Sequence, residues 1–174
     1  MTSTIHADVV VDVPVGVAYD QWTQFESFPD FLSGVDSVRQ VDDTKLHWVV
    51  SVGGVEREFD ATITEQRPDE VIAWRSTEGE IHSGRVVFTA ESAETTRIDV
   101  EMGWEPHGLV EKVGAALNID DAQVKSDLRD FKRLIEERGT PDGAWRGEVH
   151  GGSVADRDSG PAHDTGFDDR PSML

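Results

Sequence analysis

Apolar and polar residues alternate along most of the first hundred residues, which is the pattern of half-buried β-strands. The first run, residues 5–13, puts its apolar side chains on one face and its charged side chains on the other. Six further runs of the same period follow between residues 35 and 104, separated by turn sequences such as Gly53-Gly54 and Pro68-Asp69-Glu70. We expect these seven runs to form a curved antiparallel sheet.

A different spacing occupies residues 14–32. Five aromatic residues follow one another at intervals of three: Tyr19, Trp22, Phe25, Phe28 and Phe31. Pro14 suits the first turn of a helix, where its missing N–H costs nothing, and Ser27 can cap a second helix. The segment therefore predicts two short helices after the first strand, with aromatic side chains facing the sheet.

The longest helix is expected from Pro106 to about Arg138. Its apolar positions form an amphipathic stripe at spacings of three, four and seven residues: Val110, Val113, Leu117, Val124, Leu128, Phe131 and Ile135. Residues 118–121 are the weakest part of the pattern, so a kink is expected there. The element order indicates an α+β fold in which the sheet wraps around this helix.

The composition changes after Gly139. Residues 139–174 contain seven Gly and three Pro and show no periodic apolar face. We expect a folded domain over residues 1–138 and a disordered acidic Gly/Pro-rich tail over 139–174. Trp145 and Phe167 are the aromatic residues of the tail, and one of them is a candidate anchor for a protein partner.

Several segments resemble the START-like helix-grip (SRPBCC) superfamily, and within it the polyketide cyclase/dehydrase and coenzyme-Q-binding branch. They are Val11-Asp12-Val13-Pro14, Ala18-Tyr19-Asp20-Gln21-Trp22, Phe25 to Phe31, His47-Trp48, Gly53-Gly54, Ile63 to Pro68 and Ile72 to Ser76. The resemblance covers roughly residues 3–138 and implies the helix-grip fold. The branch includes aromatase/cyclases as well as carriers of lipids and quinones, so it leaves the activity open.

A sheet this curved is not filled by one helix, so we expect a cavity with a mostly apolar wall that suits a lipophilic ligand. The candidate lining residues are Trp22, Phe28, Phe31, Trp48, Phe59, Trp74, Phe88, Trp104, Val113, Gly114 and Leu117. The alternative for each of them is an ordinary place in the core. The three tryptophans on strands are the stronger candidates, because each also needs a partner for its indole N–H.

Catalysis would need polar groups inside this wall, and four residues are candidates. Arg57 and Glu65 fall on one face of a predicted strand, where Arg57 could bind a ligand carbonyl and a buried Glu65 could act as an acid or base. His82 and Tyr19 could move a proton or donate a hydrogen bond. The alternatives are strand-end or loop positions in contact with water, and a helix–sheet contact for Tyr19.

The chain carries a formal net charge of −19 and contains no cysteine. Such a surface repels nucleic acid and anionic membranes, and the absence of cysteine excludes disulfides and thiol chemistry. No segment approaches the ~20 apolar residues of a membrane span, so we expect a cytoplasmic protein without an integral membrane segment. A high-salt cytoplasm is an alternative explanation of the acidic bias.

Three functions remain open from the sequence. We expect a binding module that carries a hydrophobic or aromatic small molecule (a polyketide, quinone or lipid) in the cavity, without a cofactor or metal. The second hypothesis is an aromatase/cyclase-type enzyme that folds a poly-β-keto chain for aldol closure and dehydration. The third is a stress or interaction protein with a vestigial pocket, whose tail binds a partner.

Overall fold

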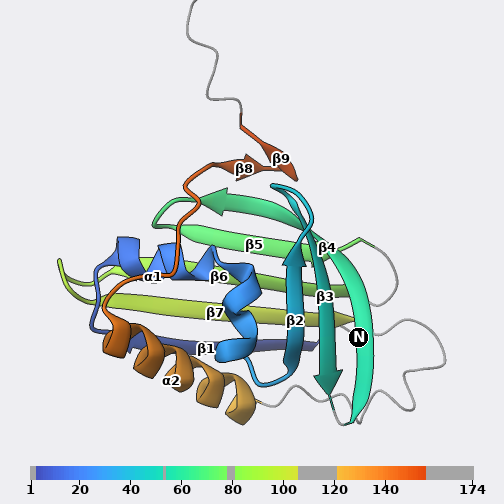
Figure 1. Ribbon diagram of the computed structural model, residues 1–174, viewed down its shortest axis with the longest axis horizontal. Helices are drawn as coiled ribbons and strands as arrows, with labels where there is room; N and C mark the ends of the chain where they lie inside the picture. The colour runs from blue at the N-terminus through green and yellow to red at the C-terminus, as the bar shows by residue number, and fades with distance from the viewer. Residues whose placement is uncertain (1–2, 53, 78–80, 106–120, 156–174) are drawn as a thin grey trace, which may run out of the picture.

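The computed structural model describes residues 3–52, 54–77, 81–105 and 121–155 (Figure 1). The strands are β1 (Ser3–Val11), β2 (Val35–Gln40), β3 (Lys45–Val52), β4 (Val55–Arg67), β5 (Val71–Ser76), β6 (Ile81–Ala90), β7 (Thr96–Glu105), β8 (Val149–His150) and β9 (Ser153–Val154). The helical elements are α1 (Val15–Trp22), the 3-10 helix η1 (Phe25–Asp30) and α2 (Asp121–Arg138).

Strands β1 to β7 form one antiparallel sheet in the order β1-β7-β6-β5-β4-β3-β2. Strands that follow one another from β2 to β7 pair as neighbours, and β1 pairs with β7 along its whole length. Strands β2 and β3 run across the direction of β1 and β7, so the sheet is strongly curved (Figure 1). The predicted α+β helix-grip architecture with a seven-stranded antiparallel sheet is confirmed, and the short strands β8 and β9 add to it.

The helical elements lie on the concave face of the sheet and meet through aromatic side chains (Figure 1). The ring centroids of Trp22 from α1 and Phe131 from α2 lie 5.3 Å apart, and Phe31 lies 5.3 Å from Trp22 and 5.0 Å from Phe131. Each of the five aromatic residues spaced by three is at most 2% exposed. The three-residue spacing of the aromatic residues therefore predicted the side chains through which the short helices contact the rest of the core.

A β-bulge in β4 changes which side chains face the core. Ile63 pairs with Trp74 and Glu65 pairs with Ala73, so Thr64 is an extra residue on β4. Beyond it the inward face passes from odd to even positions, and Gln66 is 1% exposed. The prediction that Glu65 shares the inward face of Phe59 and Ile63 is therefore wrong, because a strict period of two does not hold across a bulge.

Residues 139–155, hereafter the C-terminal strap, pack against the domain (Figure 1). Strand β8 pairs with Glu65 and Gln66 of β4, and Val149 is fully buried. The expectation of a disordered tail from residue 139 is therefore corrected for the strap, since the turns at Gly151-Gly152 let two very short strands pair without any periodic pattern. Residues 156–174 lie outside the described part of the chain.

Helix α2 buries the predicted stripe over its described length, at Val124, Leu128, Phe131 and Ile135. The expected helix start at Pro106 and the expected kink lie at least in part outside the described residues, as do Val113, Gly114 and Leu117. No helix within the described part of the chain is long and apolar enough to cross a membrane.

Candidate functional site

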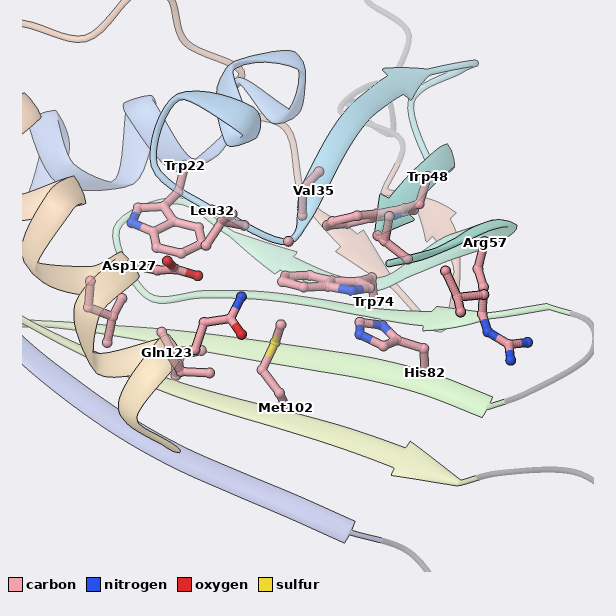
Figure 2. A pocket seen from close by; sticks show the side chains of 16 residues that line it. Trp22, Leu32, Val35, Trp48, Arg57, Trp74, His82, Met102, Gln123 and Asp127 are labelled. Atoms are coloured by element: carbon pink, nitrogen blue, oxygen red, sulfur yellow. The ribbon is translucent and has the colours of Figure 1, made fainter. Parts of the chain in front are cut away.

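A pocket lies between α2 and the concave face of the sheet (Figure 2). Its volume is about 80 Å³. The predicted cavity is therefore present. Its lining residues are Trp22, Leu32, Gly34, Val35, Trp48, Val50, Val55, Arg57, Trp74, His82, Val100, Met102, Gln123, Val124, Asp127 and Leu128.

One wall of the pocket is a stack of aromatic rings. The rings of Trp48 and Trp74 are stacked with centroids 5.6 Å apart and an interplanar angle of 25°, and Phe59 stacks on Trp48 at 5.9 Å and 9°. Trp74 lies flat over Gly84 of the neighbouring strand, where an added Cβ would be 2.1 Å from Cζ2 of the indole. A glycine at this register position is what lets the large ring lie against the sheet.

Three indole N–H groups of the pocket lining have no acceptor among the described residues. They are the Nε1 atoms of Trp22, Trp48 and Trp74, and all three are buried. A buried donor without an acceptor costs free energy, whereas a ligand that carries a carbonyl or hydroxyl oxygen could accept its hydrogen bond. Most of the pocket surface is therefore apolar, but it also presents indole N–H groups that can donate hydrogen bonds to a ligand.

His82 lies beside the aromatic stack, 5.1 Å from Phe59 and 6.3 Å from Trp48 between ring centroids. It is 6% exposed, and burial lowers its pKa to about 4. The imidazole is therefore neutral near pH 7 and can donate or accept a hydrogen bond without carrying a charge. His82 is one of the candidates predicted from the sequence, and it lies in the pocket wall.

Asp127 of α2 brings a carboxyl group to the pocket, although it is only 7% exposed. The hydroxyl of Ser33 donates to its Oδ1 at 2.8 Å, and Gln123 Nε2 donates to the Ser33 hydroxyl at 3.0 Å. Burial raises the pKa of Asp127, the hydrogen bonds from Ser33 lower it, and the charge of Asp130 raises it further.

Sequence analysis missed Asp127, although a signal was present. The residue falls between Val124 and Phe131 on the apolar stripe, three positions after the first and four before the second. A carboxylate at such a stripe position is a candidate for a buried polar group.

Arg57 of β4 also lines the pocket, as predicted for a rim position. Figure 2 shows Arg57 and Asp127 at opposite ends of the pocket, with Trp74 and His82 between them. The pocket therefore has a cationic end on the sheet and an acidic group on the helix side.

Glu65 does not reach the pocket. It lies on the outer face of the sheet, where its carboxylate is 2.9 Å from Nη1 of Arg85 and 2.9 Å from Nη2 of Arg67. Its hydrogen bond and ion pair with Arg85, followed by Arg67, lower its pKa. An ionised carboxylate paired in this way on the outer face has no access to a ligand in the pocket.

Tyr19 is buried but does not belong to the described pocket lining. Its ring packs edge-on against Phe88 at 5.4 Å, and the guanidinium of Arg146 lies 5.7 Å from its centroid. Burial is the main cause that raises its pKa to about 12, and the nearby Gln66 amide, which makes no hydrogen bond of standard geometry with it, lowers the pKa only in part. The structure thus favours the alternative of a helix–sheet contact for Tyr19.

The predicted apolar lining residues divide into three groups. Trp22, Trp48 and Trp74 line the pocket. Buried or partly buried core positions outside the lining are Phe28, Phe31, Phe59 and Phe88. The side chain of Trp104 and the residues Val113 and Leu117 lie outside the described part of the chain.

A curved sheet closed by helices over an aromatic pocket is the helix-grip architecture. The family model described as polyketide cyclase/dehydrase and lipid transport matches residues 11–133. A relative from Streptomyces lincolnensis, the uncharacterized 17.2 kDa protein in the melC2-rnhH intergenic region, is 48% identical over 148 residues, which is 84% of this chain and 99% of the relative. The chain belongs to the polyketide cyclase/dehydrase and lipid-transport family.

Solved structures share the fold. DR_A0006 from Deinococcus radiodurans superposes with a TM-score of 0.65 at 26% identity, over 78% of this chain and 98% of that one. The Zhui aromatase/cyclase from Streptomyces sp. R1128 gives a TM-score of 0.62 at 14% identity, over 80% and 94% of the two chains. The fold is also that of a START superfamily protein from Mycobacterium smegmatis, with a TM-score of 0.59 at 13% identity. The family match over residues 11–133 confirms the resemblance to the polyketide cyclase/dehydrase family that was seen in the sequence.

Proposed function

We propose that this protein binds a hydrophobic small molecule with aromatic rings, such as a polyketide or a quinone, in the pocket between α2 and the sheet. One observation carries the proposal: stacked Trp48 and Trp74 form a wall of the pocket and bring two buried indole N–H groups that have no acceptor among the described residues. A planar conjugated ligand with an oxygen acceptor offers both the flat apolar area and the acceptor that such a wall lacks.

The energetics favour burial as the source of affinity. An aromatic ligand that buries about 150–250 Å² gains roughly 4–6 kcal/mol at ~25 cal/mol per Å², before the cost of association is subtracted. Each indole hydrogen bond adds on the order of 1 kcal/mol and orients the ligand. Arg57, at the end of the pocket, is suited to bind a carbonyl or carboxylate there.

An aromatase/cyclase activity is the second candidate, and the polar groups of the pocket wall are the observation in its favour. His82 is neutral near pH 7 and Asp127 carries a raised pKa, so both could exchange protons. Figure 2 shows them in separate parts of the pocket, however, whereas proton transfer at one reacting centre needs groups that converge within ~3 Å. The arrangement supports binding more strongly than catalysis.

The test is native mass spectrometry of the protein purified from its own host, followed by solvent extraction and identification of any bound compound. We expect one equivalent of a conjugated aromatic compound, and its loss in the Trp48→Ala and Trp74→Ala variants. Trp145→Ala is the matched control, because Trp145 lies on the strap and outside the described pocket lining. A compound retained equally by the pocket variants contradicts the proposal, and so does a ligand-free protein that fails to bind added naphthalene derivatives.

A further inference from the structure

Asp127 is an unusual member of the pocket wall. Its neighbours on α2, Val124 and Leu128, contribute apolar side chains to the same pocket. Burying a carboxyl group costs free energy unless hydrogen bonds compensate for the lost hydration. An aliphatic residue at this position would avoid that cost, so the presence of the carboxyl group calls for a physical explanation.

The interactions of Asp127 within the described residues leave part of its acceptor capacity unused. The hydroxyl of Ser33 donates a hydrogen bond to Oδ1 at 2.8 Å, and the backbone N–H of Ser33 lies near enough to lower the pKa of the carboxyl group. A carboxylate offers about four acceptor sites. About two sites therefore remain for a group that enters the pocket.

Several strand residues that line the pocket have the opposite hydrogen-bonding character. The indoles of Trp48 and Trp74 can only donate, and so can the guanidinium of Arg57. These donors come from the sheet, whereas the acceptor Asp127 comes from α2 (Figure 2). A ligand that matches both sides carries an oxygen acceptor toward the sheet and a hydroxyl or amino donor toward α2.

We propose that Asp127 determines specificity by selecting aromatic ligands that carry a hydroxyl or amino group on the edge facing α2. This inference rests on the proposed function, since it concerns the same pocket. Ser33 and Gln123 act as positioning residues, because their chain of hydrogen bonds holds the carboxyl group in place. An ether or a hydrocarbon of the same shape would leave the carboxyl group without a ligand donor, and would bind more weakly.

The test compares 2-naphthol with 2-methoxynaphthalene, which differ in whether the oxygen can donate. Binding of each probe to the full chain is followed by NMR through the indole N–H signals of Trp48 and Trp74, with Trp145 as a reference outside the pocket lining. We expect the wild type to bind 2-naphthol about tenfold more tightly, as one hydrogen bond to a charged group predicts. Asp127→Leu should abolish this preference by weakening 2-naphthol binding while 2-methoxynaphthalene binds at least as well.

Two further variants keep the test decisive. Asp127→Asn preserves an acceptor for Ser33 but removes the charge, so it should fold and reduce the preference to less than about threefold. Glu137→Leu is the matched control on the same helix, because Glu137 is exposed and is not part of the described lining; it should keep the full preference.

The outcomes separate the two proposals. If both probes shift the indole signals but bind equally, or if the preference survives in Asp127→Leu, the role of Asp127 is overturned while ligand binding stands. If neither probe shifts the signals of Trp48 and Trp74, the role of Asp127 and the proposed function are both overturned.

Discussion

Trp74 depends on a single glycine for its place in the pocket wall. A Cβ at position 84 would lie 2.1 to 2.7 Å from three atoms of the indole, closer than van der Waals contact allows. We predict that Gly84→Ala displaces Trp74, lowers the free energy of unfolding by about 1–3 kcal/mol and weakens ligand binding. Urea denaturation and near-UV circular dichroism measure the two structural effects.

Gly103→Ala is the matched control on the next strand. The added Cβ would there meet the hydroxyl of Ser83 at 2.5 Å, which can rotate away, instead of a rigid ring. Gly103→Ala should therefore lower the free energy of unfolding clearly less than Gly84→Ala does. Equal effects of the two substitutions would contradict the account of Gly84 as a support for the indole.

His82 should make stability depend on pH. Burial lowers its pKa in the folded state to about 4, from 6.5 in an unfolded chain. The folded protein favours the neutral imidazole. The contribution of His82 to the free energy of unfolding is therefore fully present above pH 6.5 and is lost as the pH falls toward about 4. The loss is on the order of 3 kcal/mol in total.

The measurement is urea unfolding at several pH values in this window for the wild type and His82→Gln. The variant should lose less stability than the wild type as the pH falls, since it has no imidazole to protonate. His6→Gln, at a residue whose side chain is 70% exposed, should follow the wild type. Parallel pH curves for wild type and His82→Gln would refute the effect of burial.

At the scale of elements, the C-terminal strap is part of the folded domain. Arg146 of the strap pairs with Asp69 at 2.6 Å and with Asp20 at 3.4 Å, and the strap buries Val149 completely. We predict that Val149→Asp lowers the free energy of unfolding by about 3 kcal/mol, because it replaces buried apolar area with an unpaired charge.

Val154→Asp is the control for this effect. Val154 lies on the paired strand β9 but is 40% exposed, so the same change of charge should cost less than about 0.5 kcal/mol. Thermal unfolding of the two variants compares them directly. A small effect of Val149→Asp would mean that the strap docks without stabilising the domain.

The period-two runs predicted the seven strands, because most of the strands have one buried and one more exposed face. Strand β5 is an exception, since Val71 to Trp74 are all buried. The bulge at Thr64 was not predictable in this way, since it appears only when β4 is paired with β5. The strap escaped prediction because Val149 and Trp145 are isolated apolar residues without a period. Tertiary contacts, and not local pattern, decide both features.

The candidate site shows the same division. Trp48 and Trp74 follow from the inward face of their strands, and Arg57 and His82 follow from the same faces. The sequence pattern placed Glu65 on the same face as Arg57 only because the bulge at Thr64 cannot be seen in the sequence. Asp127 was not predicted, because only the apolar positions of the α2 stripe indicated a buried face. A polar residue on an apolar stripe carries as much information as the stripe itself.

At the scale of the whole molecule, the charge of −19 should make stability depend on salt. Acidic side chains far outnumber basic ones, so carboxylates repel one another in the compact state more than in the extended chain. Raising the ionic strength from 0.1 to 1 M shortens the screening length from about 10 Å to about 3 Å. We therefore predict that the free energy of unfolding rises with added potassium chloride, on the order of 1 kcal/mol or more.

Thermal unfolding across this range of salt is the measurement, and a variant with several exposed acids replaced by their amides is the control. Its midpoint should depend less on salt, because fewer charges remain to be screened, whereas a gain from salting-out of apolar surface would be the same in both proteins. Equal salt slopes would therefore show that repulsion between carboxylates is not the cause. A steeper slope in the wild type would identify repulsion between the surface carboxylates as the cause of the salt dependence.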